Sequence, residues 1–210
     1  MDIPDIFDGI SGNNPNDFNL DETLAQMREQ TQNLPEHIRV HYEPHLSREN
    51  FIIDGTMNSP FQYRRDSGMI AINPYHPRFG HYNVLEAITH EIAHKADNED
   101  IDSSNNKVYV NAVQRASTQV MANAEYYIQL FDDVDALFDN MSAGDIMDAL
   151  SRGDIGGSYG HHVSYWYRPS MVELEIFADI FTAVVMDDTI ALSFLGYEFP
   201  YLLKAFHGLF

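Results

Sequence analysis

The sequence predicts an α+β fold in which a small, twisted and mostly antiparallel sheet is followed by a larger helical part. Runs of β-branched and aromatic residues with strand character are confined to residues 38–73. Apolar residues at helical spacing dominate the chain after residue 83. A hydrophobic fraction of 44% over 210 residues is sufficient for one sizeable core.

The first elements follow from turn and strand signals. Residues 1–20 are rich in Asp, Asn, Gly and Pro and are predicted to be a flexible N-terminal lead-in. Asp21 then caps a helix that ends near Asn33. Four runs have strand character, and the last two are joined by the turn signal Asp66-Ser67-Gly68, which predicts a hairpin. These runs cover residues 38–42, 51–53, 61–65 and 69–73.

The remaining elements are predicted to be helices. One begins near Asn83, and residues 107–139 form either one long helix or two broken ones. Ser142 is the expected N-cap of a helix over residues 144–152, which a glycine-rich loop follows at 153–160. The last helices cover residues 171–205. No long linker interrupts residues 21–210, which we expect to form a single domain with a helical insertion at about 98–158.

The charge balance excludes some classes of partner. With 12 basic and 32 acidic residues, the formal net charge is −20, which disfavours both nucleic acid and anionic membrane surfaces. The same charge fits either a basic substrate or a well-solvated surface. The chain has no cysteine, so a bound metal would need histidine and carboxylate ligands, which suit zinc.

No targeting or membrane segment is predicted. Residues 1–5 lack the basic and apolar regions of a secretory signal peptide. The most apolar stretch, residues 191–210, is interrupted by Gly196, Glu198, Pro200 and Lys204, so we do not expect it to span a bilayer. The expected location is cytoplasmic, virion-associated, or outside the cell by a leaderless export route.

A pair of histidines four residues apart marks the candidate site. His90 and His94 share one face of the predicted helix, and Leu85, Ile88, Ile92 and Ala96 form an aliphatic stripe on the other. Two imidazoles at this spacing can bind one Zn²⁺, with Glu91 beside them as a general base. The alternative interpretation is two exposed histidines next to a surface glutamate.

Residues 171–186 offer the third ligand. This segment is apolar nearly all round and should be a buried helix, yet it contains Glu175 and Asp179 four residues apart. Buried carboxylates need a cation or good donors. We expect Glu175 to bind the zinc and Asp179 to accept the free N–H of a ligating histidine. The alternative is an acidic pair on an exposed stripe or in salt bridges.

These residues resemble the gluzincin-type zinc metallopeptidases. The two specific stretches are His90-Glu-Ile-Ala-His94-Lys-Ala-Asp97 and Glu175-Ile-Phe-Ala-Asp179-Ile-Phe, and residues 69–186 match loosely. The segment is most similar to lethal-factor-type metalloprotease domains and to those of phages and polymorphic toxins. The resemblance implies a zincin-like fold, one catalytic zinc, Glu175 as third ligand and Glu91 as base. It also implies that residues 69–73 form the edge strand along which an extended peptide lies.

Two assignments at the site have competitors. Such peptidases often place an oxyanion-stabilising tyrosine seven residues before the third ligand, where this chain has Arg168. Tyr167 is therefore the candidate, with His161 second and Tyr165 nearby, although such aromatic residues also pack in cores or cleft walls. Asp100 competes with Glu175, because metzincin-type enzymes place a ligand ten residues after the first histidine. The other histidines are predicted to be structural or at the surface: His37, His41, His45, His76, His81, His162 and His207.

The leading functional hypothesis is a zinc-dependent endopeptidase that acts on a protein or peptide, with a partner or carrier protein also conceivable. It would be encoded by a phage or prophage, or would act as a toxin or effector. The hypothesis from another class is a catalytically idle, zincin-fold structural protein, such as a minor phage head component, in which the metal braces two helices. Glu91 favours the enzyme, because a purely structural site has no use for a base.

Overall fold

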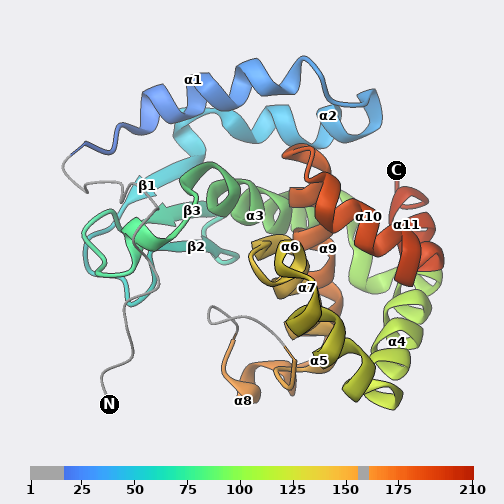
Figure 1. Ribbon diagram of the computed structural model, residues 1–210. Coiled ribbons are helices and arrows are strands. Elements are labelled where there is room, and N and C mark those ends of the chain that lie inside the picture. The colour runs from blue at the N-terminus through green and yellow to red at the C-terminus, as the bar shows by residue number, and fades with distance from the viewer. Residues whose placement is uncertain (1–16, 156–160) are drawn as a thin grey trace, which may run out of the picture.

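The computed structural model describes residues 17–155 and 161–210 (Figure 1). The predicted lead-in at residues 1–20 and the predicted glycine-rich loop at 153–160 lie partly outside the described residues. The protein combines many helices with a small mixed sheet, which agrees with the predicted α+β class. The helices are α1 (Leu20–Thr31), α2 (Glu36–Tyr42), α3 (Val84–Ala96), α4 (Lys107–Ala122), α5 (Ala124–Asp133), α6 (Asp135–Phe138), α7 (Met141–Ser151), α8 (Val163–Trp166), α9 (Met171–Val185), α10 (Thr189–Glu198) and α11 (Pro200–His207).

The sheet has three strands, β1 (Phe51–Ile53), β2 (Phe61–Arg64) and β3 (Met69–Ile72), in the order β1-β3-β2. The predicted hairpin of β2 and β3 is confirmed, and Phe61 pairs with Ile72. The prediction of a mostly antiparallel sheet is wrong, because β1 pairs with β3 in parallel. The implied edge strand is also wrong: β3 is central, and β2 is an edge. Ile70, Ala71 and Ile72 are all fully buried, as expected of a strand covered on both faces.

The run at residues 38–42 is a helix, α2, rather than the predicted strand. Ile38 and Tyr42 are fully buried, whereas Val40 between them is 49% exposed. A strand would place all three side chains on one face, and a helix places only the first and last together. The buried residues are therefore four positions apart, as in a helix. Pro35 is the N-cap residue, directly before the first turn.

Asparagine caps several helices, including the one that the sequence predicts to begin near Asn83. Asn83 caps α3 by accepting from the backbone N–H groups of the first turn. The caps predicted for the first helix and for α7 are each wrong by two residues. Asn19 rather than Asp21 caps α1, and Asn140 rather than Ser142 caps α7. Asp21 and Ser142 lie inside the first turns, and Asp21 favours the helix there by its charge.

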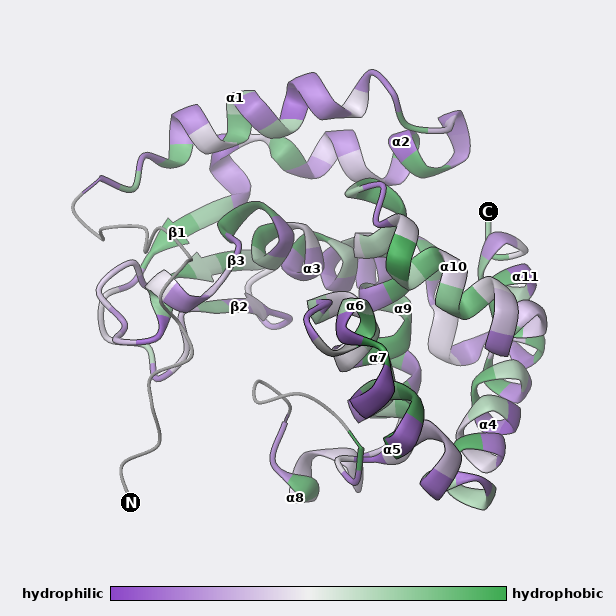
Figure 2. Ribbon diagram, viewed as in Figure 1, coloured by the Kyte–Doolittle hydropathy of each residue, from purple (hydrophilic) through white to green (hydrophobic). Residues whose placement is uncertain are grey.

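The helical half is built around α9. Residues 107–139 are broken, as one alternative predicts, but into three helices, α4 to α6, with buried apolar residues at Val113, Ala116, Val120, Tyr127 and Phe131. Figure 1 shows α3 between the sheet and this helical half, and Figure 2 shows the hydrophobic colouring of the strands and of much of α9. Although α4 to α8 separate α3 from α9 in the chain, the two helices pack against each other. Within the described residues, no helix is both long enough and apolar enough to cross a membrane.

Candidate metal centre

Helix α3 carries the predicted histidine pair on the face that its packing leaves free. Ile88, Ile92 and Ala96 are fully buried against the core, as the aliphatic stripe predicts. His90 and His94 are partly exposed on the other side, with 24% and 17% of their side-chain surface accessible. The burial of the stripe therefore fixes the direction in which both imidazoles point.

Helix α9 brings a buried carboxylate to these imidazoles. Glu175 and Asp179 are each 4% exposed, as predicted for acids in an apolar helix. Glu175 Oε2 lies 3.2 Å from His90 Nε2 and 3.5 Å from His94 Nε2, and the two Nε2 atoms are 3.1 Å apart. The group of His90, His94 and Glu175 could therefore hold a metal ion. Among the described residues, it is the group whose ligand atoms lie close enough together to do so.

Asp179 orients one of the two imidazoles. Its Oδ1 lies 3.1 Å from Nδ1 of His90, in the position predicted from the sequence. When Nδ1 donates its proton to this carboxylate, the lone pair of Nε2 is left free to face Glu175 and His94. The carboxylate also makes the imidazole a stronger ligand.

We expect Asp179→Asn to weaken metal binding about 10–100-fold without unfolding the protein. Asn can still accept a hydrogen bond from His90, but it lacks the negative charge that strengthens the ligand. Competition with a chromophoric chelator measures the affinity, and Asp132→Asn on the exposed face of α5 is the control. Equal affinities of the wild type and of Asp179→Asn would exclude this role.

The electrostatics of the centre favour a cation. Burial opposes the ionisation of Glu175, but His94, His161 and His90 surround its carboxylate and hold its pKa well below the usual value. Burial likewise opposes protonation of His90, yet Asp179 and Glu175 raise the pKa of its imidazole well above the usual value. Without a metal, the acids therefore hold protons on the imidazoles, and a divalent cation would replace those protons.

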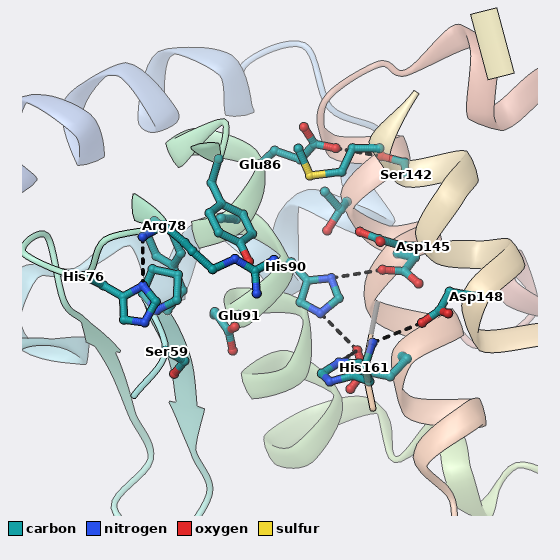
Figure 3. Close-up of a pocket in the computed structure, with 18 of the residues that line it drawn as sticks. Ser59, His76, Arg78, Glu86, His90, Glu91, Ser142, Asp145, Asp148 and His161 are labelled. Carbon is teal, nitrogen blue, oxygen red and sulfur yellow. Dashed lines mark hydrogen bonds and ion pairs between the residues drawn. The ribbon is translucent and has the colours of Figure 1, made fainter. Parts of the chain in front are cut away.

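Glu91 lies beside the ligands, at the junction of two cavities. Its Oε2 accepts a hydrogen bond of 2.6 Å from the backbone N–H of Tyr63 on the edge strand β2. Cavities of about 360 Å³ and 400 Å³ share Phe61, His90, Glu91, His161 and Glu175. A cleft therefore passes the candidate metal centre and continues on both sides of it. Figure 3 shows His90, Glu91 and His161 converging in the first of these cavities.

The structure does not bring Tyr167 to the centre, and it brings Tyr165 there instead. Tyr165 donates a hydrogen bond to Glu175 Oε1, whereas Tyr167 is 78% exposed. Successive helical residues project about 100° apart, so residues 165 and 167 of this short helical turn face nearly opposite directions. Burial and then the charge of Glu175 raise the pKa of Tyr165, which keeps its hydroxyl protonated.

His161, the second candidate, does reach the ligands. Its Nε2 lies 3.6 Å from Glu175 Oε2, and its ring stacks on Tyr165 with centroids 3.8 Å apart. Its backbone N–H donates to Asp148 Oδ2 at 3.1 Å, which ties the residue to α7. His161 and Tyr165 thus lie stacked side by side, and each directs a polar atom at the carboxylate of Glu175.

Asp100 lies away from the centre. It belongs to the π-helical turn Asp97–Ile101 after α3, and its carboxylate lies 3.7 Å from His41 Nδ1 and 3.9 Å from His45 Nε2. It does not belong to the group that could hold a metal. Of the remaining histidines, His37 and His207 pack against each other. His76 and His162 line the first cavity.

Sequence reasoning missed three acids in the first cavity. Glu86 comes from α3, and Asp145 and Asp148 come from α7. A signal for them exists: the two aspartates lie three residues apart in a helix whose other residues are mostly buried. The same pattern pointed to Glu175 and Asp179.

Comparison with protein-family models, with curated proteins and with solved structures finds no match.

Proposed function

We propose that this protein is a zinc-dependent endopeptidase, with His90, His94 and Glu175 as metal ligands. The observation that carries the proposal is the convergence of these three side chains next to Glu91 in a continuous cleft. Two imidazoles and one carboxylate suit zinc, whereas Mg²⁺ and Ca²⁺ prefer oxygen ligands. Tetrahedral bonds of about 2.0–2.1 Å separate neighbouring ligand atoms by about 3.3–3.4 Å. The observed separations of 3.1, 3.2 and 3.5 Å fit this value.

The donor set supports a catalytic site over a structural one. Structural zinc sites are usually closed by four protein ligands, whereas catalytic sites have three and an open position. Three ligands converge here, and the cleft gives access to them. Glu91 shares this cleft, which a metal that merely braces two helices would not require.

The side chains around the centre have distinct tasks in the proposed reaction. Zinc held by His90, His94 and Glu175 would supply Lewis acidity, which would lower the pKa of water towards ~7 and polarise a carbonyl. Glu91 takes the proton from the attacking water and returns it to the leaving nitrogen. Tyr165 and His161 are the candidate donors to the oxyanion, because both reach the ligand Glu175. Asp179 holds His90 in its ligating orientation.

The cleft also fits an extended peptide. It continues on both sides of the centre, as an enzyme that cuts within a chain requires. The edge strand β2 directs the N–H of Tyr63 away from β3 and into the cleft, towards Glu91. A substrate strand can add to such an edge by backbone hydrogen bonds. In this proposal β2 therefore replaces β3 as the strand that guides the peptide.

Tyr165→Phe should lower turnover by about 10²–10³-fold, with little change in metal content or KM. Only the hydroxyl is lost, and an oxyanion donor acts mainly in the transition state. Tyr167→Phe is the matched control: the same change on the exposed side of the same turn should leave the rate as in the wild type. The reverse ranking in steady-state kinetics would return the role to Tyr167. A collapse in His161→Ala beside an unchanged Tyr165→Phe would transfer it to His161.

Cleavage of a defined peptide mixture, followed by mass spectrometry, tests the function. We expect cleavage by the zinc-loaded protein, loss of cleavage on chelation and recovery when zinc is restored. A folded protein that carries one zinc per chain and cleaves no protein or peptide would contradict the proposal and favour the structural alternative.

A further inference from the structure

The first cavity has an acidic wall and a wall that carries an arginine and a histidine. Asp145 and Asp148 of α7 form one side, and Arg78 and His76 form the other, with the ligand His90 between them (Figure 3). Glu86 and Asp179 add two more carboxylates to the lining. The acidic side chains are thus not metal ligands themselves, but they line the same cavity as the ligands His90 and Glu175.

Asp145 is a partly buried acid in this lining, and among the residues that the structure describes its carboxylate has neither a hydrogen bond nor an ion pair. Burial, followed by the charge of Asp179, raises its pKa well above the usual value, and the opposing charge of His90 offsets this shift only in part. An unpaired carboxylate in such a place is costly, and a bound cation would remove that cost.

A second and independent feature of this wall is an orphaned hydroxyl. Thr182 of α9 lines the same cavity and is 3% exposed, and its Oγ1 has no hydrogen-bond partner among the described residues. Buried hydroxyl groups are normally paired. A ligand with N–H donors would satisfy the Asp145 carboxylate directly, and it would satisfy the Thr182 oxygen once a rotation of that side chain turns the hydroxyl towards the cavity.

The ligand of this wall is not a second metal ion. Metal ligands must converge on one point, and within the described ranges only His90, His94 and Glu175 do so. The acids of the cavity instead line a space of about 360 Å³, which lies in the range of small organic ligands. An elongated organic cation can contact carboxylates that lie apart from one another in this way. Its apolar stem can lie on Phe61 and Trp166, which also line the cavity.

We propose that this cavity is a specificity pocket that receives a basic side chain, arginine or lysine, of the peptide substrate. The inference rests on the proposed function, because it places the side chain beside the bond to be cut. The net charge of −20 agrees with it, since a basic substrate is attracted to the protein from a distance. Asp145 is the main anchor, with Glu86, Asp148 and the Thr182 hydroxyl as further acceptors.

Binding of small probes tests the pocket without any catalysis. The metal-depleted protein is titrated with Nα-acetyl-arginine amide, Nα-acetyl-lysine amide and the neutral isostere Nα-acetyl-citrulline amide, and NMR shifts are recorded. We expect at least one basic probe to bind about tenfold more tightly than the citrulline probe. Asp145→Asn should abolish this preference, and Glu86→Gln should reduce it if the first variant does not fold. Asp154→Asn, which removes one exposed charge nearby, should retain it. Equal binding of the citrulline probe, or a preference that survives in both pocket variants, would overturn the inference.

Cleavage specificity separates this inference from the proposed function. The zinc-loaded protein should select arginine or lysine at one position next to the cut, and Asp145→Asn should lose that selection. Cleavage without a basic preference at any position would overturn the pocket and leave the peptidase standing. Binding of basic probes through Asp145 without cleavage of any peptide would retain the pocket and remove the peptidase.

Discussion

Glu91→Gln is expected to lower peptide hydrolysis by about 10²–10⁴-fold while the fold and the metal content stay as in the wild type. Gln is nearly isosteric with Glu but cannot take a proton from water at neutral pH. Its side-chain oxygen can still accept the hydrogen bond from the Tyr63 N–H, so the contact between α3 and β2 is retained. Steady-state kinetics at known metal content, together with thermal unfolding, measures both effects.

Glu99→Gln is the control for this substitution. It makes the same chemical change just beyond the end of α3, where Glu99 contacts Lys95 and does not line the cleft. We expect wild-type turnover from Glu99→Gln. Should Glu91→Gln cleave as fast as Glu99→Gln, Glu91 is not the base, and the structural alternative gains weight.

Glu175→Ala is expected to lose the metal to a chelator that leaves the wild type loaded. The substitution removes one of three ligand atoms, so the loss of affinity should exceed the roughly 10–100-fold of an outer residue such as Asp179. It also removes the carboxylate that His90, His94 and His161 face, which leaves these groups without their anionic partner.

Asp100→Ala is the matched comparison, because Asp100 is the competing third ligand from the sequence. Its carboxylate faces His41 and His45 instead of the centre. We expect metal affinity close to that of the wild type. If chelator competition ranks Asp100→Ala as the more damaging variant, the protein uses a metzincin-type ligand set, and the assignment of Glu175 is wrong.

The parts of the site that lie on single helices are predictable from the sequence. The spacing of His90 and His94 and the aliphatic stripe opposite them fix the exposed face of α3. The acids Glu175 and Asp179 stand out because the rest of α9 is apolar and buried. In both helices a local pattern of period 3.6 determines which side chains face the cleft.

Features that depend on distant parts of the chain were not predictable in the same way. The parallel pairing of β1 with β3 depends on tertiary contacts, and so does the central position of β3.

In residues 38–42, β-branched and aromatic residues suggested a strand, although the spacing of Ile38 and Tyr42 fits a helix equally well.

The oxyanion donor shows how sensitive a site is to local geometry. The choice between Tyr165 and Tyr167 depends on the rotation of one short helical turn, which spacing to Glu175 alone does not fix. The acidic wall depends on the packing of α7 against α9, which the sequence does not specify.

The metal content of the folded protein is the most direct test of the central claim. After exposure to a slight excess of zinc and removal of unbound metal, elemental analysis should find close to one zinc per chain in the wild type. His94→Ala, treated in parallel and checked for fold by circular dichroism, should retain little. Zinc near zero in folded wild-type protein, or equal zinc in His94→Ala, would contradict a centre built on His90, His94 and Glu175.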